Sequence, residues 1–350
     1  MPGDAYIAQI TNWFTQTIAG SPIWAAIGLA AVCAAGLAVA WAILRIVWRL
    51  FGAVSSALSS RRRRQTQGYT LGVARFAGAR GNKLSKALIH ALQEDMSEFS
   101  FGAQYEVIKA PAPRASEKQG LRDVARRWLS RASSDLIVWG YRGRGSSAPL
   151  HLSILSCEGS LTPAEAQETQ VLLPGDFAKA SDIVRKAGAY LVARALQPGL
   201  ARATAFRAEK LAPVADILAK CLANPGSLPD ETVSLLETDY CAMGLHIGSD
   251  EHLIHVAELR HARLAGERQL DTETQIAARI DLGRALLGMS AKAFDPSRVR
   301  EAMDHLKAAV ELLKLNPTIQ LANHTSNAVQ QGQAMLSARQ RFSVTGGGGV

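Results

Sequence analysis

The chain has few cysteines and none of the common catalytic signatures. Its four cysteines, Cys33, Cys157, Cys221 and Cys241, stand far apart and form no C-x-x-C pair, so the sequence lacks a zinc-type cysteine motif. In a cytoplasmic domain such thiols stay reduced. The sequence also contains neither G-x-S-x-G nor H-E-x-x-H, the signatures of two large classes of hydrolase. These absences predict a protein that is not an enzyme and that carries no cofactor.

Charge is also absent from one long stretch. Residues 22–44 include no acidic, basic, histidine, asparagine or glutamine side chain. A helix of about 20 apolar residues is long enough to cross a bilayer, and tryptophans near both ends suit its interfaces. We therefore predict a single transmembrane helix at 22–50, preceded by a short extracytoplasmic segment at 1–21. The alternatives are a cleaved signal peptide and a buried helix. Both are disfavoured, because no basic residue precedes the run and the run is too long.

Arginines follow this apolar run. Asp4 is the only charged residue before it, whereas six arginines and no acid occur from 45 to 64. This asymmetry predicts an outside N-terminus and a cytoplasmic C-terminal bulk, as in a single-pass protein of the bacterial inner membrane. We predict a basic juxtamembrane linker at 51–68. Each arginine in the linker or just before it adds about 1 kcal/mol of attraction to anionic lipids. The predicted membrane-surface contacts are Arg45, Arg49, Arg61, Arg62, Arg63 and Arg64.

The net charge of +9 comes from the N-terminal part of the chain. Its basic residues are not interleaved with aromatic residues and match no nucleic-acid motif, so nucleic acid is not an expected partner. The apolar run is rich in alanine and glycine. Small side chains let helices approach closely in lipid, which makes a homo-oligomer a hypothesis.

Residues 69–197 alternate between strand and helix patterns. Apolar or alternating runs predict strands at 69–76, 105–109, 135–140, 150–155 and 169–173, and helical spacing predicts helices at 82–92, 121–129 and 176–196. Asn82 is the expected cap of the first helix. The order β-α-β-α-β-β predicts a small α/β module.

Two stretches of this module carry a family resemblance. The opening strand at 71–76 (LGVARF) and the strand ending in glycine at 134–140 (SDLIVWG) are followed by a hairpin and by a helix after Gly175. This arrangement resembles the α/β module of the TolB amino-terminal type. In that family the module serves recognition and assembly, so the resemblance implies a non-catalytic role. This chain continues with helices where TolB has a β-propeller.

Residues 198–342 have an all-helical pattern, and 343–350 form a Gly-rich tail that we expect to be flexible. The predicted helices are 203–222, 230–246, 250–265, 272–289, 296–313 and 317–341. Helices paired in series predict a repeat domain, because each unit must bury its apolar face against its neighbours. The fold class expected for the whole chain is therefore α/β plus all-α, behind a transmembrane helix.

One helix pair resembles a tetratricopeptide repeat. The matching positions, which we expect to pack the two helices together, are Leu282, Gly283, Leu286, Ala302, Leu306 and Ala309. The pair departs from the repeat at Arg279, which replaces the usual tryptophan. The connection at 288–296 is also about seven residues longer than in the standard repeat.

Two groups of residues were considered for chemistry. The predicted strand–helix loop at 78–85 offers an anion site at Gly78, Arg80, Gly81, Asn82, Lys83 and Ser85, but it fails the Walker pattern because Asn82 separates Gly81 from Lys83. The second group is His246, His252, His255 and His261, with Glu258. We interpret these histidines as surface or packing residues and predict no metal site.

The expected function is a membrane-anchored scaffold that binds protein partners through its helical repeats. The alternative is a ligand- or nucleotide-responsive sensor that uses the loop at 78–85. The sequence leaves the identity of the partner open. Repeat domains present extended surfaces that suit protein segments, and this favours the scaffold.

Overall fold

The computed structural model describes residues 68–78, 80–110, 134–143, 148–156, 167–197, 203–266, 270–315 and 317–345, and single residues between and before these ranges. The chain divides into two compact units, 1–66 and 67–350. Of the predicted membrane helix, residues 34, 36–41, 43 and 45 are described and are helical; the rest lies outside the described residues. Within the described part of the chain, no helix is both long and apolar enough to cross a membrane.

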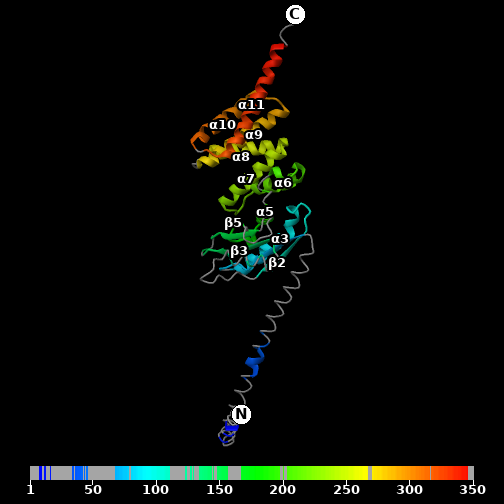
Figure 1. Cartoon of the computed structure of the whole chain (residues 1–350), viewed down its shortest axis with the longest axis vertical. Helices are drawn as coiled ribbons and strands as arrows, with labels where there is room; N and C mark the ends of the chain where they lie inside the picture. Colours follow the sequence, from blue (N-terminus) through cyan, green and yellow to red (C-terminus); the bar gives the residue numbers. More distant parts are fainter. Residues whose placement is uncertain are drawn as a thin grey trace. The chain divides into compact units, whose positions relative to one another are not determined.

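The second unit contains a five-stranded mixed sheet (Figure 1). The strands are β1 (Tyr69–Ala74), β2 (Tyr105–Ala110), β3 (Leu136–Arg142), β4 (Leu150–Ser156) and β5 (Gln167–Leu173), in the order β2-β1-β3-β4-β5. β1 pairs in parallel with β2 and β3, and β4 is antiparallel to β3 and β5. The predicted mixture of sheet and helices is thus confirmed, and all five strands lie at or near their predicted positions.

Apolar residues cover both faces of the sheet. On one face, Leu71, Leu136 and Leu152 pack with two helices, α3 (Gly81–Asp95) and α5 (Asp182–Leu196). On the other face, Ile137 and Trp139 pack with Leu129, a helical residue of the predicted helix at 121–129. Most of that predicted helix lies outside the described residues. Because successive side chains of a strand point to opposite faces, β3 contributes to both cores.

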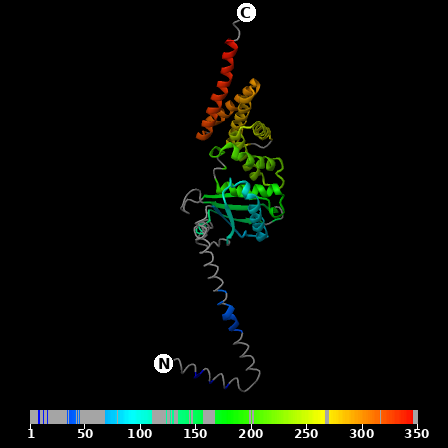
Figure 2. The same cartoon turned by 90° about the vertical axis from the view of Figure 1, so that its right-hand side faces the viewer.

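Six helices follow α5 along the chain, and Figure 2 shows this helical part from green to red. They are α6 (Ala208–Ala223), α7 (Asp230–Ile247), α8 (Asp250–Ala265), α9 (Thr272–Lys292), α10 (Pro296–Leu315) and α11 (Ile319–Thr345). Each contacts the next along the chain, and α9 also contacts α7 and α11. This serial packing follows from the apolar stripe on each helix, which a single neighbour cannot cover.

The sheet and the helices share one hydrophobic core. Buried residues run without interruption from the sheet through α5 to α6, α7 and α8. The buried carboxylate of Asp239 in α7 accepts hydrogen bonds from Tyr190 and Arg194 of α5. Burial raises the pKa of Asp239, and the Arg194 guanidinium opposes that rise. Removing the helices would therefore expose apolar residues of α5.

The structure corrects four local predictions. Asn82 does not cap α3, because the helix starts at Gly81 after Arg80 in the left-handed conformation. The predicted helix from 176 begins as a separate 3-10 turn, η3 (Phe177–Lys179), and α5 starts only after the extended Ala180. The helix predicted from 203 likewise begins as a 3-10 turn, η5 (Ala203–Ala205), before α6. Most of the predicted connection at 288–296 is helical, because α9 extends to Lys292.

Candidate functional site: a groove between α6 and α8

A groove of about 680 Å³ lies between α6 and α8, with Tyr240 of α7 at its side. Its apolar lining comes from Ala219 and Ala223 of α6 and from Ile254 of α8. Ile254 is 47% exposed, which is high for a large apolar side chain in a packed helical domain. Ile254 and the two alanines thus form a small apolar strip along the groove.

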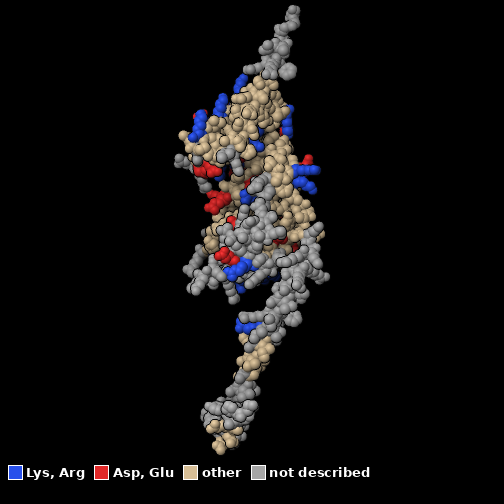
Figure 3. Space-filling model, viewed as in Figure 1, with Lys and Arg blue, Asp and Glu red and all other residues tan. Residues whose placement is uncertain are grey.

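Acidic side chains surround this apolar strip. Asp216 of α6 and Glu251 and Glu258 of α8 line the groove, together with one lysine, Lys220. The side chains of Asp216 and Glu258 are 57% and 68% exposed. In the view of Figure 3, acidic and basic atoms both occur along the helical part, on its left and right sides. The groove itself is lined by three acids and one lysine. The groove therefore has a negative lining despite the positive charge of the whole chain.

Local sequence features place α8 beside this groove. Ser249 caps the helix by accepting a hydrogen bond from the His252 backbone. Gly244 of α7 allows close approach, since a Cβ there would lie 2.8 Å from Val256 Cγ2. Tyr240 shares a hydrogen bond of 3.2 Å with His252 Nδ1. These contacts hold the α8 side of the groove against α7.

A buried ion network joins α7, α8 and α9. Arg260 donates hydrogen bonds to Glu237 of α7 and to Asp281 of α9, at 2.6 Å and 2.9 Å. The Arg260 side chain is only 6% exposed. Arg263 lies 3.9 Å from the second oxygen of Glu237 and donates to Ser234. Arg260 and Glu237 face each other in the core, whereas Arg263 and Ser234 also line a second cavity of about 780 Å³.

The four histidines that lie close together in the sequence are on α7 and α8. His246 bonds to the backbone oxygen of Phe206, and His252 is buried beside Tyr240. His255 lies 3.6 Å from Glu258. His246 thus has a partner of its own, whereas His252 and His255 both pack against the ring of Tyr240.

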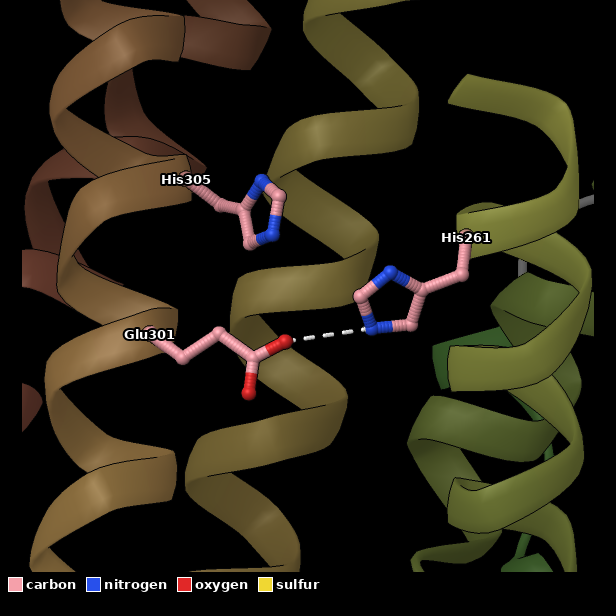
Figure 4. Close-up of side chains that lie close together, drawn as sticks. All are labelled: His261, Glu301 and His305. Atoms are coloured by element: carbon pink, nitrogen blue, oxygen red, sulfur yellow. Dashed lines mark ion pairs between the residues drawn. The ribbon is translucent and has the colours of Figure 1, made fainter. Parts of the chain in front are cut away.

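His261 instead meets two residues of α10. Its Nε2 lies 3.2 Å from Glu301 Oε1, and its ring centroid lies 5.8 Å from that of His305. Figure 4 shows the three side chains pointing toward one another from α8 and α10. Sequence reasoning missed this group because Glu301 and His305 are forty or more positions from His261. The signal that could have found it is the i, i+4 spacing of Glu301 and His305 on one helix.

Backbone amides of the predicted anion loop form hydrogen bonds within the loop. The amides of Gly81, Lys83 and Leu84 donate to carbonyls of Gly78 and Arg80. A Cβ at Gly81 would lie 2.1 Å from the Phe76 oxygen, so this glycine is required by packing. Three amides that a phosphate would need are therefore already bonded within the loop. Asn82 and Ser85 are both on α3, where the Ser85 hydroxyl donates to the Asn82 carbonyl.

The six predicted packing positions lie on α9 and α10. A Cβ at Gly283 would lie 2.7 Å from Leu306 Cγ and 3.2 Å from the Ala302 oxygen, so the two helices approach closely there. All six are buried: Leu282, Gly283, Leu286, Ala302, Leu306 and Ala309.

Of the predicted membrane-surface arginines, the structure describes Arg45 alone. Its guanidinium carbon lies 5.1 Å from the ring centroid of Trp41. The other five, Arg49 and Arg61 to Arg64, lie outside the described residues.

Buried cysteines offer no nucleophile in the described helices. Cys221 and Cys241 are free and buried. Burial raises the pKa of the Cys221 thiol to about 11 and that of Cys241 higher still. A thiol is nucleophilic as the thiolate, so neither is reactive near neutral pH.

Comparison with known proteins gave no match. No protein-family model, no curated protein and no solved structure is similar to this chain.

Proposed function

We propose that this protein is a membrane-anchored, non-catalytic scaffold that holds a basic segment of a partner protein in the groove between α6 and α8. The proposal depends mainly on one observation, the exposed Ile254 between acidic residues of two helices. The resemblances to a TolB-type module and to tetratricopeptide repeats remain predictions that agree with this role.

Charge and shape together select the class of partner. Carboxylates at Asp216, Glu251 and Glu258 favour lysine or arginine, and like charge on a partner would be repelled. Ile254 and the two alanines offer contact to an apolar side chain beside those basic residues. A short amphipathic segment, lying along the groove with one apolar and one basic edge, satisfies both requirements.

Site-specific photo-crosslinking tests this proposal in the full-length chain. A photoreactive amino acid replaces Ile254, and the crosslinked protein is identified from membranes. We expect one dominant crosslinked partner whose yield falls several-fold when Glu251→Lys and Glu258→Lys are added. The matched control is the pair Asp304→Lys and Glu311→Lys, which reverses two exposed acids of α10 and should leave the yield unchanged.

Two results would refute the groove. In the first, the Glu251/Glu258 variant crosslinks as well as the unmodified chain. In the second, the α10 control loses the crosslink equally. Point variants are used because the helices share a core with α5, so deleting them would disturb the sheet domain as well.

The anchor is part of the same proposal. The uncharged run at 22–44 supports it. The described helical residues Leu37, Val39, Trp41 and Ile43 are each more than half exposed, as expected of side chains that would face lipid. We expect the protein to stay in the membrane fraction at alkaline pH, and a Leu37→Asp, Val39→Asp variant to be released. Equal release of both proteins would exclude the anchor.

The sensor alternative receives less support. Three backbone amides of its loop at 78–85 already donate hydrogen bonds to carbonyl groups of the same loop. Saturable nucleotide binding by the full chain, lost in Lys83→Ala, would favour it over the scaffold.

A further inference from the structure

We propose that His261, Glu301 and His305 form a binding site for a divalent first-row transition ion such as Zn²⁺, which would bridge α8 and α10. The donor atoms of the three side chains all lie within 4.8 Å of one another. Two imidazoles and one carboxylate are a ligand set that zinc and its neighbours accept. The site is separate from the α6–α8 groove and does not depend on the proposed scaffold function.

The geometry needs only small side-chain movements. Zinc binds nitrogen or oxygen at about 2.0–2.2 Å, which places the donors of a tetrahedral site about 3.3 Å apart. The His261–Glu301 pair already has this separation, at 3.2 Å. The donor atoms of His261 and Glu301 must also come closer to that of His305. Rotation of the His261 and Glu301 side chains can bring this about, because they are 48% and 46% exposed. The three ligands leave one position for water.

The backbone holds both sides of the site in place. Glu301 and His305 are four residues apart on α10 and so share one helical face. On α8, Arg260 directly precedes His261 and is bound to Asp281 of α9. The close contact at Gly283 fixes α10 against the same α9. Both ligand-bearing helices are thereby fixed to α9, which favours a preorganised site.

Charged groups of both signs lie near the His305 ring. The charge of Arg279 opposes a cation, whereas Glu301 and Asp304 near the same ring favour one.

The test is metal titration of the full-length chain, purified in detergent and freed of metal by a chelator. Zn²⁺ binding is followed by calorimetry and Co²⁺ binding by its visible absorption. We expect one ion per chain and an absorption intensity typical of four-coordinate cobalt. His261→Ala and Glu301→Gln should each weaken binding by about tenfold or more, in line with the loss of a ligand contact.

His90→Ala is the matched control. His90 on α3 lies 3.2 Å from Glu94 at i, i+4, so it repeats the histidine–glutamate pair without belonging to the three-ligand group. This variant should bind the ion as the unmodified chain does. Circular dichroism checks folding, and Glu301→Gln keeps the test decisive if a histidine variant unfolds.

Three outcomes would overturn the site. They are no saturable binding at one ion per chain, unchanged affinity in His261→Ala and Glu301→Gln, and an equal loss in His90→Ala. None of these depends on a partner protein, and the crosslinking test uses Ile254, Glu251 and Glu258. Failure of the metal site and failure of the scaffold can therefore be told apart.

Discussion

Replacing Arg260 by methionine should strongly destabilise the helical part of the protein. The guanidinium donates three hydrogen bonds, one to Glu237 and two to Asp281, between 2.6 Å and 3.2 Å. Its side chain is 6% exposed, and those of Glu237 and Asp281 are 10% and 20% exposed. Methionine fills much of the same space but leaves Asp281 without this ion pair and Glu237 with only the more distant Arg263, at 3.9 Å.

The size of the effect follows from this burial. Each hydrogen bond to a charged group is worth about 1.5–3 kcal/mol, and breaking a buried ion pair costs about 3–5 kcal/mol. We therefore expect Arg260→Met to lower the free energy of unfolding by about 3–5 kcal/mol. Adding Glu237→Gln and Asp281→Asn removes the uncompensated charges and should recover about half of that loss.

Denaturant unfolding of the full-length chain in detergent, followed by circular dichroism, measures these differences. Arg300→Met is the control, because Arg300 is exposed on α10 and surface changes usually stay within about 0.5 kcal/mol. A loss below about 1 kcal/mol for Arg260→Met would refute the reasoning. So would a triple variant no more stable than the single one.

Two further predictions concern packing and pH. Gly283→Ala should lower the free energy of unfolding by about 1–3 kcal/mol, because its Cβ would lie 2.7 Å from Leu306 Cγ. The control Gly288→Ala on the same helix should lower it less, because a Cβ there lies 3.1 Å or more from leucine methyl groups. Equal thermal stability of the two variants would contradict this prediction. Burial raises the pKa of Asp95 at the end of α3, and one of its oxygens is buried with no hydrogen-bond partner among the described residues. The folded state therefore binds this proton more tightly than the unfolded state, and the contribution of Asp95 to stability falls as pH rises above about 4. Asp95→Asn should raise the unfolding temperature at pH 7 but not below about pH 4, whereas the control Glu94→Gln, which loses an ion pair with α5, should not raise it at either pH.

Much of the fold was predictable from local patterns. Alternation in 150–155 predicted β4, and helical spacing in 250–265 predicted both ends of α8. These signals succeed because strand and helix periods are properties of consecutive residues. The local errors occur at helix starts. Asn82 has the chemistry of a cap, but α3 already starts at Gly81, which lies close against the Phe76 backbone.

The candidate sites were less predictable. Arg260 is a charged residue of the kind usually found on the surface of a helix, and only the positions of α7 and α9 show that it is buried. His261 stood in a row with three other histidines, yet its neighbours are Glu301 and His305 from another helix. Such contacts depend on which helix faces pack together, and no short sequence window contains that information.

The sequence by itself determined the order of strands and helices and the presence of one uncharged run long enough to cross a membrane, because both depend on the periodicity and polarity of neighbouring residues. The tertiary structure alone decided that the sheet and the helices share one core, that Ile254 lies between acids of two helices, and that a glutamate and two histidines converge between α8 and α10. The physical reason is the same in each case. Long-range packing brings together side chains whose separation along the chain carries no signal of their distance in space.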